Sequence, residues 1–157
     1  REYTNDLYFV FTVQEELGLR GSKPAAYGID PDYGIAVDVT AAEELDDTHR
    51  SSTVLGDGAA IKIMDSSVIC HPNIVKILEE LGLSSKIPCQ KDVLIAGGTD
   101  AGAIHVSRGG VQTGGISIPC RYIHSPVEMV SLEDVSAAVR LMTAFAEKKL
   151  EITKDVM

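Results

Sequence analysis

The chain lacks the features that mark membrane-spanning, secreted or disulfide-stapled proteins. It has no tryptophan, 5% aromatic residues and three cysteines, Cys70, Cys89 and Cys120, without C-x-x-C spacing. No apolar run reaches the ~20 residues that a membrane span needs, and no secretory signal pattern opens the chain. We therefore expect a cytoplasmic protein with no membrane partner, whose reduced thiols occupy buried packing positions.

Positive charge is also scarce. Lysine and arginine number 14 against 23 acidic residues, which gives a net charge of −9. Without a basic patch to meet phosphates, nucleic acid is excluded as a partner. The acidic balance does not identify a substrate, because many intracellular proteins are acidic. The glycine-rich stretch at residues 97–102 matches neither the G-x-x-x-x-G-K nor the G-x-G-x-x-G phosphate-binding pattern.

The length of 157 residues and the hydrophobic fraction of 45% fit one domain with a substantial core. Apolar, β-branched runs predict strands at residues 7–13, 34–39, 59–64, 90–96 and 111–118. The first of these is nearly continuous apolar, so we expect it to be buried on both faces. Between them, patterns typical of helices cover residues 22–27, 71–82, the stretch from the 97–102 turn through His105, and the segment after Ser131.

Helix boundaries can be read from a few residues. Pro72 favours a helix start at His71, and Gly82 fits the position just past its end. Ser131 is expected to cap the last helix, with Asp134 three residues on in a near capping box. Residues 42–52 are polar and acidic and are expected to form a surface loop. The alternation of strands and helices predicts an α/β sandwich around a mostly parallel sheet, whose ligands collect beyond the carboxyl ends of strands.

Two adjacent carboxylates, Glu15 and Glu16, follow directly after the first apolar run. Such a pair at the end of a buried strand is costly, because the charges repel and each resists leaving water. Asp38 follows another apolar run, and His124 stands in a later loop. Carboxylates and an imidazole at strand ends suit Zn²⁺, Co²⁺ or Mn²⁺. A solvated surface pair is the ordinary alternative for Glu15 and Glu16, and a turn or cap is the alternative for Asp38.

Four motifs then occur in a fixed order, at residues 13–21 (VQEELGLRG), 37–40 (VDVT), 97–102 (GGTDAG) and 118–126 (IPCRYIHSP). Together they resemble the dinuclear metal aminopeptidases of the glutamyl-aminopeptidase and tetrahedral (TET) aminopeptidase family. The resemblance runs over nearly the whole chain. It implies a three-layer αβα sandwich of the zinc-peptidase type.

The resemblance also implies a role for each candidate residue. Glu15 is similar to the general base, which takes a proton from a water activated by two metals and passes it to the leaving amine. Glu16 and His124 resemble ligands of one metal, and Asp38 resembles a ligand of the other. Two divalent ions per complete site are implied, zinc or cobalt first and manganese as a further option.

Other residues of these motifs are weaker candidates. Asp100 could contact the substrate or cap the following helix, and the two readings are equally supported by sequence. The substrate-binding candidates are Gly98, Thr99, Asp100, Arg121 and Tyr122. Arg121 and Tyr122 could also position the residues that bind the metal ions. The remaining histidines lack a comparable context, so we do not expect ligands at His49, His71 or His105.

The sequence departs from the family pattern near its start. A complete site of this family needs a histidine and a bridging aspartate upstream of Glu15. The residues before Glu15 include Glu2 and Asp6 but no histidine, and no apolar strand that could present one. The family's inserted β-rich domain is also absent. We therefore expect residues 1–157 to be the C-terminal portion of the catalytic domain, a partial sandwich, and we expect the isolated chain to be inactive.

The function expected from the resemblance is release of N-terminal residues from peptides. Two alternatives stay open: a non-catalytic fragment or assembly module of such an enzyme, and a related metal-dependent deacylase or carboxypeptidase. The resemblance further implies a homo-oligomer, with a dodecamer as one form, where the upstream domain is present.

Overall fold

The computed structural model describes residues 4–42 and 51–151. Along the chain the elements are η1 (Glu15–Leu17), α1 (Ser22–Ile29), β1 (Tyr33–Ala41), β2 (Ala59–Met64), α2 (Pro72–Ser84), β3 (Cys89–Val93), α3 (Ala101–Ile104), β4 (Gln112–Arg121), β5 (Met129–Val130) and α4 (Leu132–Glu147). Within the described ranges, no helix is both long and apolar enough to cross a membrane.

The sheet follows the order β1-β4-β2-β3, and the short β5 pairs with β4. β1 and β4 are parallel, as are β2 and β3, but the central pair β2 and β4 is antiparallel. The expectation of a mostly parallel sheet is therefore wrong in the middle. The cause is that β4, the last long strand in sequence, inserts between β1 and β2 and runs with β1.

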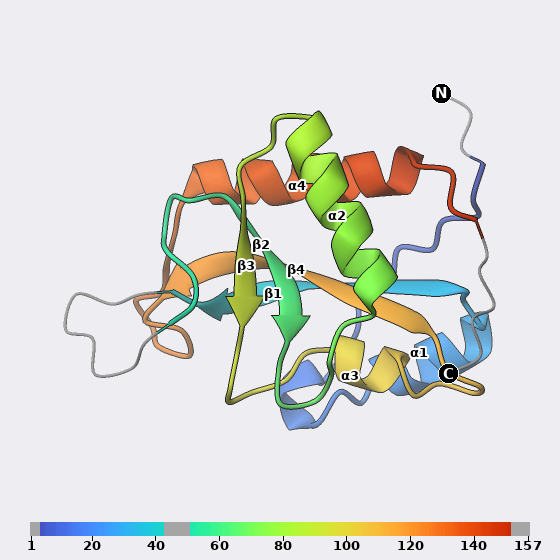
Figure 1. Ribbon diagram of the computed structural model, residues 1–157. Helices are drawn as coiled ribbons and strands as arrows, with labels where there is room; N and C mark the ends of the chain where they lie inside the picture. Colours follow the sequence, from blue (N-terminus) through green and yellow to red (C-terminus); the bar gives the residue numbers. More distant parts are fainter. Residues whose placement is uncertain (1–3, 43–50, 152–157) are drawn as a thin grey trace.

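Helices cover both faces of the sheet (Figure 1), as expected for an α/β sandwich. α2 and α4 pack on one face, where Ile61, Ile74, Leu78, Ile116 and Leu141 form the centre of the main core. Burying each such side chain contributes about 1.5–3 kcal/mol. α1 and α3 lie on the other face. There a smaller core of short side chains leaves room for polar groups on the sheet surface.

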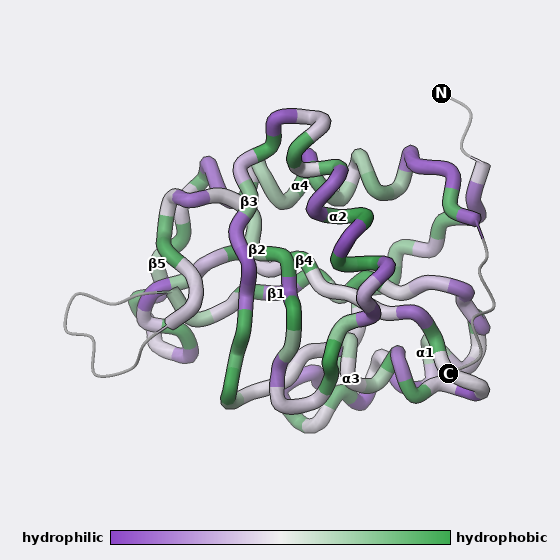
Figure 2. Tube along the Cα trace, viewed as in Figure 1, coloured by the Kyte–Doolittle hydropathy of each residue, from purple (hydrophilic) through white to green (hydrophobic). Residues whose placement is uncertain are grey.

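α2 begins as expected and ends later than expected. His71 is its N-cap, and the ring Nδ1 accepts a hydrogen bond from the Asn73 backbone N–H at 3.3 Å. The helix alternates between hydrophobic and hydrophilic stretches (Figure 2). Gly82 does not end it, because the helix continues to Ser84. Gly82 is buried, and a Cβ there would come within 2.9 Å of the Cys89 Sγ, so close packing on β3 explains the glycine.

α4 starts where the sequence indicates, but Asp134 has another task. Ser131 caps the helix by accepting a hydrogen bond from the Glu133 N–H at 3.2 Å. Asp134 is fully buried and accepts hydrogen bonds at 2.8 Å from the Gly56 and Gly58 N–H groups. The capping-box interpretation is therefore wrong. The carboxylate instead ties the loop before β2 to the start of α4.

The expected first strand does not form. No strand is assigned to residues 7–13, and Phe9 and Phe11 are 73% and 95% exposed. A strand buried on both faces needs neighbours to pair with and layers to cover it. The described part of the chain supplies neither.

The strand expected at residues 59–64 is found with those bounds, and the remaining strand expectations hold with shifted ends. The strand expected over residues 90–96 ends earlier, at Val93, and the one expected over 111–118 continues to Arg121. Most of the surface loop expected at residues 42–52 lies outside the described residues.

Candidate active site

A closed turn sets the direction of Glu15 and Glu16. Gln14 and Gly18, on either side of η1, both have left-handed backbones, with φ of 56° and 101°. The Gly21 N–H donates to the Val13 carbonyl at 2.9 Å, and a Cβ on Gly21 would come within 2.5 Å of the Val13 nitrogen. Gly21 therefore lets the chain return tightly against residues 12–13, and the two carboxylates stand at the turn.

Glu15 is partly buried and surrounded by other acids. Burial raises the pKa of its carboxyl most, and the nearby carboxylates of Asp38, Glu16 and Asp100 raise it further. His124 acts in the opposite direction. Two other segments, β1 and the loop before α3, therefore bring carboxylates to Glu15, which already neighbours Glu16 in sequence.

Asp38 lies on β1, three residues before the strand ends. Its Oδ1 accepts a hydrogen bond from the Val39 N–H at 2.8 Å. Burial raises the pKa of the Asp38 carboxyl, while that hydrogen bond and the nearby Lys62 ammonium lower it. The net shift is upward, because the carboxylates of Asp100 and Glu16 add to the effect of burial.

Glu16 and His124 face each other across the site. The His124 Nδ1 lies 3.7 Å from the Glu16 Oε1, and both side chains are exposed, at 67% and 74%. His124 has a left-handed backbone with φ of 62°, and its backbone N–H donates to the Glu128 carboxylate at 2.7 Å. An unusual backbone held by such a contact is typical of functional loops.

Asp100 does not cap α3 with its side chain, and its charge acts on Glu15 and Asp38. Its Oδ2 accepts a hydrogen bond from the Thr12 hydroxyl at 2.7 Å. Its Oδ1 is buried and has no hydrogen-bond partner within the described ranges. The capping alternative is therefore excluded, and Asp100 joins the acidic cluster of Glu15, Glu16 and Asp38.

Thr99 and Gly98 serve the loop that carries Asp100. Thr99 is buried and donates its hydroxyl to the Asp65 Oδ2 at 3.0 Å. Asp65 is also buried and accepts hydrogen bonds from Ser67 and Val68. A Cβ on Gly98 would come within 2.9 Å of the Ser67 Oγ. In this structure both residues hold the loop against the turn after β2, and their contact with a substrate remains a prediction.

Arg121 and Tyr122 lead from β4 into the loop of His124. Arg121 pairs with Met129 of β5, and Tyr122 has a left-handed backbone with φ of 57°. Both residues therefore shape the loop that presents His124. Their expected supporting role remains a prediction.

Two residues near the site were not singled out by sequence. The sequence predicts that Thr12 lies in a buried strand, yet its hydroxyl donates a hydrogen bond to Asp100. Lys62 stands in the apolar strand β2 and is fully buried. A lysine inside an apolar strand is a usable signal, because a buried lysine almost always has a partner.

The other histidines have no place in this cluster. His71 is the N-cap of α2, as expected for a residue that starts a helix. Both ring nitrogens of His105 are buried, and neither has a hydrogen-bond partner within the described ranges. His49 lies outside the described residues.

The donor types of the cluster fit a divalent cation. Carboxylate oxygens and an imidazole nitrogen are suitable ligands, and a cation would relieve the repulsion that raises the pKa of Glu15. Glu16 and His124 already lie side by side. However, no three His, Cys, Asp or Glu side chains converge on one point within residues 4–42 and 51–151. The described residues thus fit part of a metal shell.

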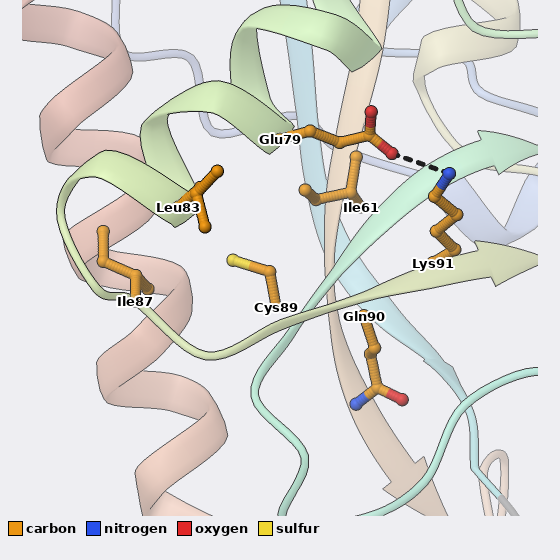
Figure 3. Close-up of a pocket in the computed structure, with 8 residues that line it drawn as sticks. Ile61, Glu79, Leu83, Ile87, Cys89, Gln90 and Lys91 are labelled. Carbon is orange, nitrogen blue, oxygen red and sulfur yellow. Dashed lines mark ion pairs between the residues drawn. The ribbon is translucent and has the colours of Figure 1, made fainter.

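An apolar pocket lies at the β3 edge of the sheet, separate from this cluster. It has a volume of about 320 Å³ and lies between the end of α2 and the edge strand β3 (Figure 3). Leu83, Ile87 and Cys89 line it, and an ion pair between Lys91 and Glu79, 2.9 Å long, lies beside it. It shares no lining residue with the acidic cluster.

Solved structures of aminopeptidases share this fold. An aminopeptidase from the archaeon Desulfurococcus kamchatkensis superposes with a TM-score of 0.85 at 46% identity, covering 88% of this chain and 40% of that one. The TET1 peptidase of Pyrococcus horikoshii, which can assemble into a tetrahedron or a large octahedral shell, gives a TM-score of 0.76 at 34% identity, covering 88% and 40%. The fold of this chain is therefore the fold of part of these aminopeptidases.

Sequence comparison gives the family. Residues 1–141 match the M42 glutamyl aminopeptidase family. The lysyl aminopeptidase of Pyrococcus furiosus is 38% identical over 148 residues, which are 94% of this chain and 42% of that protein. A protein of Acetivibrio thermocellus is 53% identical over 138 residues, or 88% of this chain and 42% of its own length. The chain belongs to the M42 glutamyl aminopeptidase family and spans about two fifths of the length of these relatives.

Proposed function

We propose that residues 1–157 carry the general base and part of the metal shell of an aminopeptidase that releases N-terminal residues from peptides. The observation that supports this most is the environment of Glu15. Its pKa is raised by burial and by three neighbouring carboxylates. A carboxylate is a better general base when its pKa moves up toward the working pH.

Glu15 accepts a proton from the attacking water and returns it to the amine of the departing peptide. Glu16 is more exposed and lies against His124, so its carboxylate is placed to bind a cation together with the imidazole. Asp38 presents a second carboxylate from β1. The adjacent Glu15 and Glu16 thereby divide two roles that one residue could not fulfil together.

Glu16 and His124 would hold one divalent ion and Asp38 would contribute to a second, zinc or cobalt being the best match to oxygen and imidazole ligands and manganese a further option. When bound, the ions would polarise the scissile carbonyl and acidify the attacking water. They would also balance the negative charge that Glu15, Asp38 and Asp100 share.

The cysteines and the assembly of a related peptidase bear on the cellular compartment and the oligomeric state. Its three cysteines are free, which supports a reducing compartment such as the cytoplasm. The TET1 peptidase that shares its fold can assemble into a tetrahedron or a large octahedral shell. We therefore propose that the whole protein is a cytoplasmic homo-oligomer that acts on peptides.

A second candidate function is that of a non-catalytic assembly module. The observation that favours it is that no three metal-binding side chains converge within the described ranges. On this view the isolated chain binds divalent ions weakly and hydrolyses aminoacyl substrates negligibly. Two ions bound per isolated chain, with clear turnover, would exclude this candidate.

The experiment compares the isolated chain with a fusion in which residues 1–141 replace the matched region of the Acetivibrio thermocellus relative. Both are assayed with free-amine peptides, N-acylated amino acids and substrates cleaved at the C-terminus. Hydrolysis of free-amine peptides alone, by the fusion, is the expected result. Preference for acylated or C-terminal substrates would instead indicate a deacylase or a carboxypeptidase, and a metal-loaded but inactive fusion would contradict the proposal.

A further inference from the structure

A buried ion pair joins the neighbouring strands β2 and β3. Lys62 of β2 and Asp92 of β3 are paired in register, and their side chains are 0% and 1% exposed. The Lys62 Nζ lies 2.5 Å from the Asp92 Oδ2. Taking two charges out of water is costly, and replacing such a pair by apolar residues is often neutral or stabilising. Stability alone therefore does not explain why this pair is present.

The position of the pair relates it to β1. The Lys62 ammonium also donates to the Thr40 hydroxyl at 3.4 Å. Thr40 is fully buried and belongs to β1, which is separated from β2 by β4. The lysine side chain therefore crosses over β4. Gly115 of β4 makes this crossing possible, because a Cβ there would come within 2.9 Å of the Lys62 Cβ.

Thr40 lies two residues after Asp38, so both side chains project from the same face of β1. The adjacent Ala41 carbonyl accepts a hydrogen bond from the Thr53 hydroxyl at 2.7 Å. The end of β1 is thus held at Thr40 by Lys62 and at Ala41 by Thr53. β1 is an edge strand of this sheet, so these contacts replace support that a neighbouring strand would give.

We propose that Lys62 is a positioning residue of the site: locked by Asp92, its ammonium holds the end of β1 through Thr40 and so fixes the direction in which Asp38 presents its carboxylate. The inference rests on the proposed function of Asp38 as a metal ligand. When a residue that orients a metal ligand is replaced, the affinity for the metal typically falls about 10–100-fold.

The first test uses a matched pair of variants at Thr40. Thr40→Val keeps the shape of the side chain but removes the hydroxyl that Lys62 binds, whereas Thr40→Ser keeps the hydroxyl. Two quantities are measured on the full chain: the three-bond NMR couplings that report the Asp38 χ1 angle, and the affinity for Zn²⁺ by calorimetry. We expect averaged couplings and roughly tenfold weaker Zn²⁺ binding in Thr40→Val, with both values near wild type in Thr40→Ser.

A second variant tests the pair itself. Lys62→Met combined with Asp92→Leu keeps the net charge and replaces the ion pair by apolar groups, so the fold is expected to persist. The same averaging of Asp38 and the same loss of affinity are expected. Lys91→Met is the control, because Lys91 pairs with Glu79 on the opposite face and should change neither quantity.

The outcomes separate the inference from the proposed function. Unchanged Asp38 couplings in both Thr40→Val and the double variant would overturn the positioning role, whether or not the Zn²⁺ affinity changes. A wild-type chain that binds no Zn²⁺ would weaken the proposed function, while the couplings would still decide on Lys62. Averaged couplings in Thr40→Ser as well would assign the effect to packing and also overturn the inference.

Discussion

At the scale of single residues, the adjacent Glu15 and Glu16 meet different surroundings. Glu15 is partly buried among carboxylates, whereas the Glu16 side chain is 74% exposed. Within the described residues, Glu16 forms an ion pair with the His124 ring. The left-handed Gln14 before them and Gly18 after them close a turn that separates the two directions. Two chemically identical side chains thereby become suited to two different tasks.

A matched pair of variants tests this division. In the fusion described above, Glu15→Gln is expected to keep the metal content and lower kcat by ~10²–10⁴, because a general base is lost. Glu16→Gln is expected to lose metal as well as activity, because a ligand is weakened. Elemental analysis and steady-state kinetics on both variants decide. If Glu15→Gln loses its metal and Glu16→Gln keeps it, the two roles are reversed.

The histidines allow a similar comparison. His124→Ala is expected to remove the ion shared with Glu16 and abolish activity in the fusion. His71→Ala is expected to keep metal and activity but to lower the free energy of unfolding by about 0.5–2 kcal/mol, because it removes the N-cap of α2. Metal content and thermal unfolding are the measurements. Full metal occupancy in His124→Ala would refute the assignment.

Cys70 gives a prediction that depends on pH. Burial, aided by the Asp65 carboxylate, raises the pKa of its thiol from 9.0 to about 11. The folded state therefore resists loss of this proton. The associated stability is fully present below pH 9 and is lost as the pH rises through about 11. Chemical unfolding between pH 8 and 11 measures it.

In the same chain at pH 8, a thiol reagent should react with Cys89 before Cys70 and Cys120. Cys89 lines the open pocket beside β3, whereas the other two are 3% and 1% exposed. Mass spectrometry of the labelled peptides gives the order. Equal rates for all three would show that the chain opens globally before it reacts.

At the scale of elements, a few buried polar groups join segments that are distant in sequence. Asp134 at the start of α4 binds the loop before β2, and Asp65 at the end of β2 binds the loop before α3. Each carboxylate satisfies several donors at once. Buried groups of this kind are worth more than surface contacts, because removing them leaves donors without partners.

Asp134 is the clearest case for a test. Asp134→Ala leaves the buried Gly58 N–H and the Gly56 N–H without acceptors, so we expect a loss of more than about 2 kcal/mol in the free energy of unfolding. Ser131→Ala, three residues earlier, removes an ordinary helix cap and should cost only about 1 kcal/mol. Urea unfolding of both variants gives the comparison. Equal losses would mean that Asp134 acts as a cap and not as a tie to the loop.

At the scale of the whole molecule, the main feature is an uncovered apolar segment. Residues 7–13 contain Tyr8, Phe9, Val10 and Phe11, all exposed, and β1 beside the acidic cluster is an edge strand. Exposed apolar stretches and free strand edges promote association. In the longer relatives, the additional chain is available to cover such surfaces.

We therefore expect the isolated chain to self-associate as its concentration rises. Phe9→Ser combined with Phe11→Ser should reduce association without lowering the melting temperature by more than a degree or two, because both rings are mostly exposed. Sedimentation velocity and thermal unfolding are the measurements. Leu132→Ser, at another exposed apolar position, is the control. A chain that stays monomeric at high concentration would contradict the expectation.

The sequence by itself determined the α/β class and most helices and strands, and it named Glu15, Glu16, Asp38 and His124 as candidates for a site. These are local properties: hydrophobic period, caps such as His71 and Ser131, and short motifs around Glu15, Asp38 and His124. Their order along the chain was also enough to indicate the family. None of these inferences required knowing which segments are neighbours.

Only the tertiary structure decided the rest. Whether residues 7–13 form a buried strand depends on partners, and an apolar pattern does not show whether they are present. The antiparallel pairing of β2 with β4, the buried packing of Gly82 and the long reach of Lys62 over Gly115 to Thr40 are contacts between distant segments. The physical reason is that burial and charge pairing depend on what lies nearby in space, whereas periodicity and capping depend on what lies nearby in sequence.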